Sequence, residues 1–441
     1  MYEMKIKTID AYQIFDSRGN PTVEAIVTLE NGATGIGTVP SGASTGQYEA
    51  LELRDGGSAY RGKSVYEAIG NIKTVIFEGL KNQSAFDQKA IDHAMIELDG
   101  TENKRRLGAN AILGVSMAVA NAAANAQNVP LYHYLGGGKG NLLPLPEIQI
   151  IGGGAHANWR TDVQDFLLIA TGAKTYQDTL EITHNVYHAA GDILKEKGQY
   201  YGLADEGGYW PAFETHDEIF NVLMEAIQRA GYIPGKDAAI SLDVAASDLF
   251  DGNVYRLALE NRSFSSDEFA DLMVEWCDKY PIISLEDPMA DTDWAGWDRI
   301  CRTIGHKVQI IGDDLFTTHI RRIARGIEKG AANSVLIKLN QIGTVSETIC
   351  AIELTQQAGW LPVVSARSGE TEDAFISHLA VATNAGQLKV GSFARSERMV
   401  KWNEVLRIER RLGDKARFLG AGIYDRIFKI SGLSKPHKHP E

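Results

Sequence analysis

The sequence predicts an N-terminal α+β domain followed by a (β/α) barrel, and three observations support this fold class. The chain has 441 residues, a length that accommodates a barrel of about 250 residues and a smaller second domain. Its first part places strand-like segments before helical ones, which is the order of an α+β domain. The remainder repeatedly alternates a short apolar run with an amphipathic segment, which favours a closed barrel over an open sheet.

The first domain is expected to contain two strands followed by three helices. Its strand segments are rich in β-branched and aromatic residues, and the residues between them are typical of a turn. Apolar residues then recur with helical spacing. The expected strands are residues 6–15 and 22–29 around a turn at 16–21, and the expected helices are 65–80, 85–98 and 109–126.

The second domain is expected to begin after the glycine-rich segment 136–140. We therefore place the domains at 1–140 and 141–430, with a C-terminal tail at 431–441. The repeated units of the second domain predict a parallel sheet. The expected strands are 239–242, 282–285, 308–311, 334–337 and 361–365, and the expected helices include 266–279, 320–329, 345–358 and 372–383.

The composition argues against several classes of partner. Lys and Arg total 44 and Asp and Glu total 57, which gives a net charge of −13. This charge argues against binding of nucleic acid or an anionic membrane, although a local cation can still attract a small anionic substrate. No apolar run is long enough to span a membrane, and the start lacks the apolar core of a signal peptide. Three cysteines without a disulfide or metal spacing indicate a reducing compartment, so we expect a soluble cytoplasmic protein.

Ionisable residues follow several expected barrel strands at the point where each strand ends. Their spacing corresponds to one or two strand–helix units, so they should converge on one face of the barrel. The carboxyl ends of barrel strands are where catalytic groups lie. These residues are Asp243, Glu286, Asp313, Lys338, Arg367 and Lys389.

The three acids of this set suggest a metal site. Asp243, Glu286 and Asp313 would repel one another unless a cation lay among them. A site built from oxygen ligands suits Mg²⁺, which keeps water and substrate oxygens as its other ligands. The alternative is that these acids are helix N-caps or surface groups. Lys338 and Lys389 suggest proton abstraction, because a lysine close to other cations loses its proton more easily.

Nearly the whole chain, from about residue 8 to residue 424, resembles the enolase (phosphopyruvate hydratase) family. The resemblance implies an enolase-type (β/α)8 barrel as the second domain. It is carried by FDSRGNPTVE at 15–24, VPSGASTG at 39–46, GANAILGVS at 108–116, DEGG at 205–208, LEDP at 285–288, GDDL at 312–315, KLNQIG at 338–343, RSGETED at 367–373 and RSER at 395–398.

The resemblance implies a reaction and the residues that perform it. Lys338 would take the C2 proton of 2-phosphoglycerate, with Lys389 holding the carboxylate and helping Lys338 lose its proton. Glu206 would protonate the departing C3 hydroxyl. In enolase-superfamily sites a base removes the proton beside a carboxylate, and Mg²⁺ stabilises the resulting negative charge. The resemblance implies the same scheme for this chain.

Further residues receive binding roles from the same resemblance. Two Mg²⁺ per active site are implied. The first metal would be bound by Asp243, Glu286 and Asp313, and Ser44 would reach the second from a loop that closes over the substrate. Arg367 and Ser368 would bind the phosphate, and His156, Gln164 and Asp165 would line the pocket, with His156 as a proton donor or ligand.

Each of the isolated signals has a structural alternative. Glu206 stands before two glycines, so it could be an ordinary turn residue. Ser44 could belong to a plain solvent loop instead of a lid. Ser368 precedes an expected helix start at Thr371, which suits phosphate binding as well as simple capping. A lone histidine such as His156 is often structural.

The chain departs from the family pattern inside the expected pocket. Ala366 stands where the family has a histidine, and Asp165 stands where the family has a glutamate. Trp159 and Arg160 occupy loop positions where small residues are usual. Losing one hydrogen bond to a transition state costs about 3 kcal/mol. Arg160 could suit a different or larger anion, or it could merely repack the loop.

Three functions therefore remain open. The first is Mg²⁺-dependent interconversion of 2-phosphoglycerate and phosphoenolpyruvate in glycolysis. The second is an enolase-like enzyme of phosphonate biosynthesis, similar to carboxyphosphonoenolpyruvate synthase, which Ala366, Asp165 and Arg160 favour. The third is a non-catalytic binding protein on an enolase scaffold. The family resemblance also implies a homodimer or a higher homo-oligomer.

Overall fold

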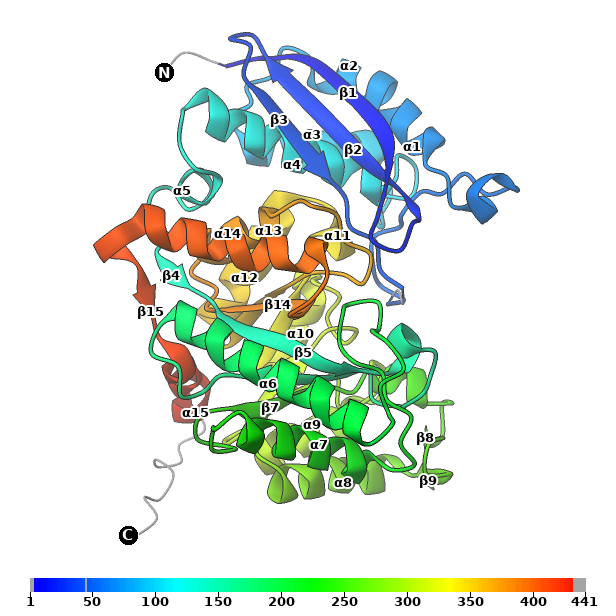
Figure 1. The fold of residues 1–441 in the computed structure, drawn as a ribbon. Helices are drawn as coiled ribbons and strands as arrows, with labels where there is room; N and C mark the ends of the chain where they lie inside the picture. Colours follow the sequence, from blue (N-terminus) through cyan, green and yellow to red (C-terminus); the bar gives the residue numbers. More distant parts are fainter. Residues whose placement is uncertain (1–3, 44–45, 431–441) are drawn as a thin grey trace.

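A closed barrel lies beneath a smaller layer of three strands and several helices (Figure 1). The computed structural model describes residues 4–43 and 46–430, so the predicted tail 431–441 lies outside the described residues. The predicted closed barrel is confirmed. Its strands in spatial order are β5 (Leu145–Gly152), β6 (Asp165–Ile169), β7 (Ala239–Asp243), β10 (Ile282–Glu286), β11 (Gln309–Gly312), β12 (Ser334–Ile337), β13 (Leu361–Ser365) and β14 (Gln387–Ser392).

One barrel strand contradicts the expectation of a parallel sheet. Strand β6 runs antiparallel to both β5 and β7. The first residue of β6, Asp165, is therefore paired with Asp243 at the carboxyl end of β7, and Asp243 is paired with Glu286 on β10. The reversal places the start of β6 at the same mouth as the ends of the other strands.

The outer helices cover the barrel, and several begin with strong capping signals. The side chains of Thr175, Thr215 and Ser265 each accept a backbone N–H and form a capping box with an acid three residues later. Such reciprocal bonds satisfy N–H groups that the first turn leaves free. The helices are α6 (Tyr176–Glu196), α7 (His216–Arg229), α8 (Ser266–Lys279), α9 (Trp294–Ile304), α10 (Ile320–Lys329), α11 (Leu339–Ile342), α12 (Val345–Gln357), α13 (Phe375–Ala382), α14 (Ser396–Leu412) and α15 (Asp425–Ile430).

The remaining strands outside the barrel are short. A small hairpin formed by β8 (Tyr255–Leu257) and β9 (Arg262–Phe264) follows β7. Strand β4 (Leu142–Leu143) pairs in parallel with β15 (Arg417–Phe418), so the last part of the described chain lies beside the segment that enters the barrel. No helix among the described residues is long and apolar enough to cross a membrane.

The N-terminal layer contains one more strand than predicted. Strands β1 (Ile6–Phe15) and β2 (Pro21–Leu29) match the two expected strands, and β3 (Thr34–Thr38) completes an antiparallel sheet. Strand β3 contains Gly35 and Gly37, and glycine weakens a strand signal in the sequence. A Cβ atom on Gly35 would lie 2.1 Å from the Ala122 nitrogen, so these glycines allow a helix to pack directly against the strand.

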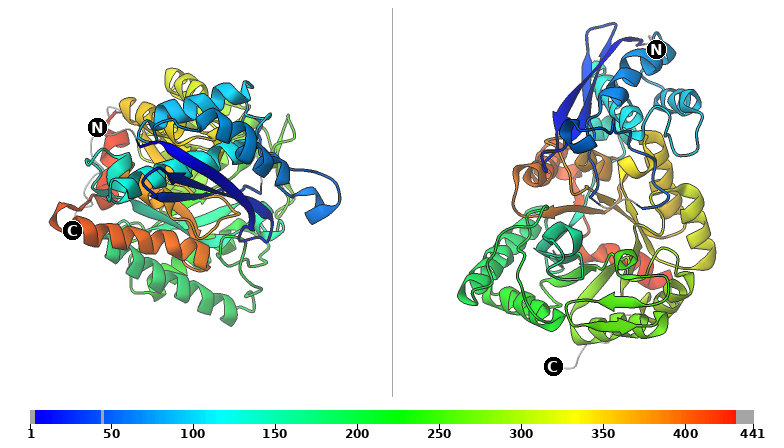
Figure 2. Two further views of the ribbon diagram at one scale, coloured as in Figure 1. Left: turned by 90° about the horizontal axis from the view of Figure 1, so that it is seen from above. Right: turned by 90° about the vertical axis from the view of Figure 1, so that its right-hand side faces the viewer.

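That helix is α4 (Ala109–Ala126), which matches its predicted range and is almost entirely buried. It packs on β2 and β3, and the sheet and the helices form two layers above the barrel (Figure 2). The predicted helix 65–80 is interrupted by a π-helical turn, and the predicted helix 85–98 begins later. The observed elements are α1 (Tyr66–Asn71), the π-helical turn Ile72–Ile76, α2 (Phe77–Leu80), α3 (Gln88–Asp99) and α5 (Leu131–Leu135).

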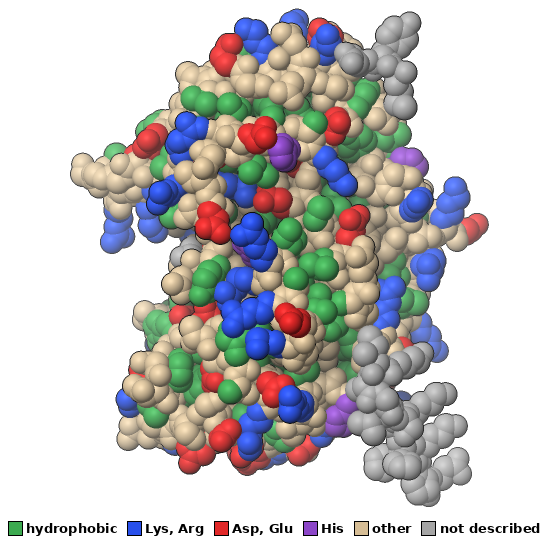
Figure 3. Space-filling model, turned by 180° about the vertical axis from the view of Figure 1, so that it is seen from behind, with side chains coloured by type: hydrophobic (Ala, Val, Ile, Leu, Met, Phe, Trp, Pro, Cys, Tyr) green, Lys and Arg blue, Asp and Glu red, His purple; other side chains and the backbone are tan. Residues whose placement is uncertain are grey.

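The N-terminal layer contacts the barrel mouth directly. The backbones of Ser41 and Gly369 exchange two hydrogen bonds of 2.8 and 2.9 Å. This pairing joins the loop after β3 to the loop after β13. Seen from behind, the two parts form one continuous surface on which both acidic and basic side chains occur (Figure 3).

Candidate active site

Most of the predicted site residues line one pocket at the barrel mouth. The closed order of the strands brings together positions that are far apart in the sequence. Glu286 lies beside this pocket and contacts Lys389, whereas Ser44 lies outside the described residues. The predicted residues that line the pocket are His156, Gln164, Asp165, Glu206, Asp243, Asp313, Lys338, Arg367, Ser368 and Lys389.

Lys389 joins two of the predicted metal ligands. Its Nζ lies 2.7 Å from Asp243 Oδ2 and 2.7 Å from Glu286 Oε2. Burial acts to lower the pKa of Lys389, but these two carboxylates raise it well above its ordinary value. Burial acts to raise the pKa of Asp243, and Lys389 holds it below its ordinary value. Burial and the neighbouring Asp243 raise the pKa of Glu286 well above its usual range.

Lys338 forms an equivalent ion pair with Asp313. Burial, Arg367 and Lys389 act to lower the pKa of Lys338, but Asp313 outweighs them and the pKa is raised. Asp313 is the ion-pair partner of Lys338 in this arrangement, so the sequence-based expectation that Lys338 loses its proton easily beside Mg²⁺ stays a prediction. The other Asp313 oxygen, Oδ1, accepts a 2.8 Å hydrogen bond from Gln341 Nε2.

The three predicted metal ligands fit a hard divalent cation. Asp243, Glu286 and Asp313 are all buried, at 3%, 1% and 8% exposure. The Glu286 Oε1 atom is buried and has no hydrogen-bond partner among the described residues. A buried carboxylate oxygen without a hydrogen-bond partner favours the binding of a cation. Lys389 pairs with Asp243 and Glu286, and Lys338 pairs with Asp313, so each of the three acids has a lysine partner in this arrangement.

A different group of acids is more compact. Oxygens of Asp287, Asp313 and Asp314 lie within 4.8 Å of one another. However, Asp287 accepts the backbone N–H groups of Asp313 and Asp314 at 2.8 Å each. Asp287 therefore shapes the turn after β11, and burial raises its pKa well above the usual range. Burial also raises the pKa of Asp314, to about 7.

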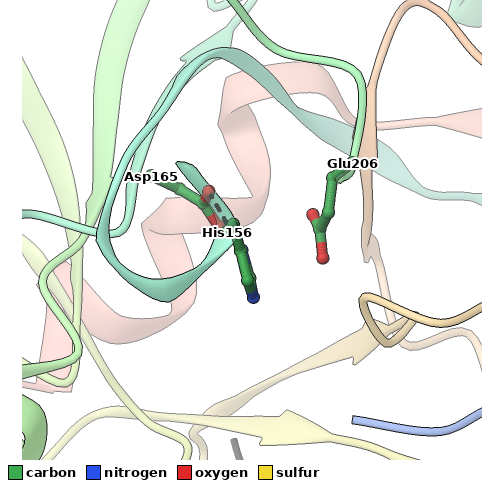
Figure 4. A group of neighbouring side chains, drawn as sticks. All are labelled: His156, Asp165 and Glu206. Carbon is green, nitrogen blue, oxygen red and sulfur yellow. Dashed lines mark ion pairs between the residues drawn. The ribbon is translucent and has the colours of Figure 1, made fainter. Parts of the chain in front are cut away.

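His156, Asp165 and Glu206 form a second group across the mouth from Lys338. Strands β12 and β6 are four places apart in the closed strand order, so residues that follow β12 face residues that precede β6. His156 and Glu206 point the same way into the pocket, with Asp165 behind the histidine (Figure 4). Potential ligand atoms of the three lie within 4.8 Å of one another.

The surroundings of His156 and Glu206 favour the protonated forms of both side chains. Burial raises the pKa of Glu206. Burial acts to lower the pKa of His156, but Asp165 and Glu206 raise it. His156 Nδ1 lies 3.8 Å from Asp165 Oδ1, which is an ion-pair distance but too long for a hydrogen bond. A carboxyl group with a raised pKa can donate a proton near neutral pH.

Arg367 and Ser368 form the third part of the site. Arg367 Nη1 lies 3.0 Å from Glu49 Oε2 and donates to Asn340 Oδ1 at 2.8 Å. The Ser368 hydroxyl is buried without a hydrogen-bond partner among the described residues, and Arg398 binds the backbone carbonyls of both Arg367 and Ser368. A buried cation beside an unpaired hydroxyl suits an anion such as phosphate.

One predicted feature of this anion site is wrong. The helix expected to start at Thr371 instead starts at Phe375, so Ser368 and Gly369 do not precede a helix N-terminus. The intervening residues are held by side-chain contacts, including the hydrogen bond between Thr38 and Thr371 and the ion pair between Lys401 and Glu370.

The residues that differ from the family pattern lie in different parts of the structure. Ala366 lines the pocket, as does Asp165. Arg160 does not line it. Its guanidinium carbon lies 4.6 Å from the ring centre of Tyr201 and 5.3 Å from that of Trp210. The idea that Arg160 meets the substrate anion is therefore wrong, because aromatic faces hold the guanidinium elsewhere.

Several residues that take part in the contacts of the site were not predicted. Asn340 and Gln341 follow Lys338 directly, and their polar side chains at a strand end were a usable signal. Asp314 next to Asp313 was another such signal. Glu49 carried none, because its contact with Arg367 joins residues 318 positions apart.

Comparisons with known proteins give one consistent result. The profile described as "Enolase, N-terminal domain" matches residues 6–135, and that described as "Enolase, C-terminal TIM barrel domain" matches residues 140–427. The chain is also similar to "Enolase 1" of Desulfitobacterium hafniense (strain Y51). The two are 54% identical over 427 residues, which cover 96% of this chain and 98% of that relative.

Proposed function

Because this chain belongs to the enolase family, we propose that it catalyses the reversible dehydration of 2-phosphoglycerate to phosphoenolpyruvate. The observation that carries this proposal is that Lys338 and Glu206 both line one pocket. Elimination of water needs a base at C2 and an acid at the C3 hydroxyl. Both groups are available here, and they face a shared space.

Lys338 acts as the base. Its amine takes the C2 proton, and the electrons of the broken C–H bond first move into the carboxylate to give an ene-diolate. These electrons then form the C2–C3 double bond as the C3 hydroxyl departs. Lys338 can accept this proton only when its ion pair with Asp313 is weakened, as happens when Asp313 binds a cation instead. Lys389, which is buried and lines the pocket, holds the substrate carboxylate.

Glu206 acts as the acid. It donates a proton to the leaving C3 hydroxyl, which departs as water. Its raised pKa keeps the carboxyl group protonated closer to neutral pH than an exposed glutamate. His156 lies beside Glu206 and assists by donating a proton or a hydrogen bond to the same end of the substrate.

The remaining residues orient the substrate. Arg367 and Ser368 bind the phosphate, while Gln164 and Asp165 border the pocket between His156 and the metal ligands. Gln164 Nε2 donates to Asp243 Oδ2 at 2.8 Å, which fixes the amide against the acid cluster. Holding the reacting groups in this geometry lowers the entropic part of the barrier.

The carboxylates provide the place for metal. Asp243, Glu286 and Asp313 would hold one Mg²⁺, and Ser44 would contribute to a second, so two ions per active site are expected. Bound Mg²⁺ supplies positive charge that stabilises the ene-diolate formed when the C2 proton is removed. The buried and unpartnered Glu286 Oε1 supports this assignment.

The alternatives raised by the sequence are less well supported. The near full-length similarity to a relative named enolase does not favour the phosphonate-type enzyme. Arg160, one of its supports, lies against aromatic rings outside the pocket. The binding-protein alternative predicts loss of the catalytic set, whereas Lys338, Glu206 and Lys389 are all present and line the pocket.

The decisive experiment measures conversion of 2-phosphoglycerate with and without Mg²⁺. We expect Mg²⁺-dependent turnover, and a fall of about 100-fold to 10,000-fold in Lys338→Ala because general base catalysis is lost. Lys307→Ala, which removes an exposed lysine paired with Asp278, is the matched control and should leave the rate unchanged.

Solvent exchange of the C2 proton separates the alternatives. Exchange without turnover would favour an enzyme with another leaving group. The absence of both turnover and exchange in the wild-type protein would favour a binding protein.

We further propose that the protein is cytoplasmic and forms a homodimer or a higher homo-oligomer, as its family membership suggests. Light scattering coupled to size-exclusion chromatography tests this assembly. A monomeric mass at micromolar concentration would contradict it.

A further inference from the structure

Two loops carry the acid side of the proposed active site. The histidine loop, residues 153–164, contains His156, and the glutamate loop, residues 200–213, contains Glu206. The loops touch beside both side chains, because the Asp205 N–H donates to the His156 carbonyl at 3.2 Å. The relative position of the two loops therefore sets the relative position of the two acids.

Arg160 connects these loops through its side chain. It belongs to the histidine loop, and its guanidinium carbon lies 4.6 Å from the ring centre of Tyr201 and 5.3 Å from that of Trp210, both in the glutamate loop. We call this contact the Arg160 stack. Within residues 4–43 and 46–430, no carboxylate forms an ion pair with Arg160. The aromatic faces are thus its principal partners, and arginine binds such faces well.

The backbone next to Arg160 is strained. Asn158 and Trp159 both have positive φ, at 55° and 57°. Residues other than glycine rarely adopt this conformation, and two in succession persist only when surrounding contacts hold them. Within the loop, the Trp159 N–H donates to the Gly154 carbonyl at 2.8 Å and the Arg160 N–H to the Ala157 carbonyl at 3.3 Å. This tight turn directs Arg160 back toward the glutamate loop.

The aromatic partners also depend on this contact. The Trp210 indole N–H is buried and has no hydrogen-bond partner in the described part of the chain. The indole is therefore held mainly through its faces and edges. A Cβ atom on Gly202 would lie 2.8 Å from Trp210 Nε1, so the close packing requires glycine at that position.

We propose that Arg160 is a positioning residue, and that the Arg160 stack holds His156 and Glu206 in the arrangement that protonates the leaving group. This proposal rests on the proposed function. Lys338 follows β12, and among the described residues its ion pair is with Asp313 and its backbone N–H donates to Thr318, neither of which belongs to these loops. The stack should therefore affect loss of the C3 hydroxyl and leave proton removal from C2 largely intact.

The test compares Arg160→Met with Arg160→Lys. Methionine keeps most of the aliphatic volume but removes the cation, whereas lysine keeps the cation. We expect kcat for dehydration to fall about tenfold in Arg160→Met, with KM and the C2 exchange rate changed less than about twofold. Arg160→Lys retains the cation and Trp210→Phe retains an aromatic face, so each of these variants should keep most of the wild-type rate.

The matched control is Arg325→Met. Arg325 on α10 lies 4.2 Å from the ring centre of Trp294 on α9, and neither residue lines the pocket. Its replacement removes a similar cation–π contact and should leave kcat unchanged. Equal losses of kcat and C2 exchange in Arg160→Met, or no rescue by Arg160→Lys, would overturn the positioning role.

Hydrogen exchange of backbone amides provides a readout that does not depend on activity. We expect residues 153–164 to exchange faster in Arg160→Met than in the wild type, with β12 unchanged. Unchanged exchange in that loop would overturn the proposal even if the enzyme is active. Failure of the proposed function is distinct, because it would appear as wild-type protein without turnover.

Discussion

At the scale of single residues, the pocket differs from the family pattern most clearly at Ala366. This methyl group lines the pocket at 6% exposure, between Ser365 and Arg367, the proposed phosphate-binding residue. The resemblance places a histidine at this position. The pocket thus retains its proposed base, acid and metal ligands but lacks one side-chain donor near the phosphate.

Restoring that donor should raise activity. In Ala366→His we expect kcat for dehydration to rise by about tenfold to a hundredfold, because a donor aimed at developing charge is worth a few kcal/mol. Steady-state kinetics with 2-phosphoglycerate measures the change. Ala366→Leu adds volume without a donor and serves as the control, and an unchanged rate in Ala366→His would show that the missing histidine does not limit catalysis.

At the scale of elements, strand β5 carries a buried acid below the active site. Glu147 is fully buried and accepts hydrogen bonds from Gln387 Nε2 at 2.8 Å and Ser241 Oγ at 3.2 Å. Burial raises its pKa to about 7 from the ordinary value of 4.5. Folding therefore favours its protonated form, and the resulting stabilisation is complete below about pH 4.5 and is lost as the pH rises toward 7.

The pH dependence of this stabilisation by Glu147 can be measured. We expect Glu147→Gln to raise the free energy of unfolding at pH 8 by about 3 kcal/mol and to change it little at pH 4.5, because the amide stays neutral. Urea unfolding at the two pH values tests this. Glu275→Gln, on the exposed side of α8, is the control. Equal effects at both pH values would contradict a titrating Glu147.

The sequence predicted no strand range for β5, β6 or β14, and it gave no indication of the direction of β6. The last four residues of β6 form a buried apolar run that is compatible with either direction. The connection from β5, which contains no α-helix, and the pairing with β7 decide the orientation, and both are properties of the assembled sheet. The predicted strands β12 and β13 and helices α4, α8 and α10 match their ranges because local periodicity specifies them.

At the scale of the whole molecule, the N-terminal layer completes the barrel site. Glu49 from that layer holds the guanidinium of Arg367, and the loop around Ser41 pairs with the backbone of Gly369. Neither part alone contains the arrangement that we propose binds the phosphate. The domain boundaries predicted at residues 140 and 430 stay predictions.

Metal binding should stabilise the whole molecule. A ligand that binds only the folded state adds about 2.7 kcal/mol at a concentration 100 times its Kd. We therefore expect Tm to rise with Mg²⁺ concentration, and the rise to be lost in Glu286→Gln. Differential scanning fluorimetry measures this, with Asp278→Asn as an exposed control that keeps the wild-type response. A Tm independent of Mg²⁺ would argue against the metal site.

The sequence by itself determined the barrel, several of its helices and the acids and lysines at the strand ends, because periodicity and residue type are local properties. Only the tertiary structure decided how these groups pair. It placed Asp313 against Lys338, reversed β6 so that Asp165 reaches the mouth, brought Glu49 to Arg367, and turned Arg160 onto Tyr201 and Trp210. Each of these contacts joins distant segments, and competition among charges, aromatic faces and backbone directions in the folded chain selects it.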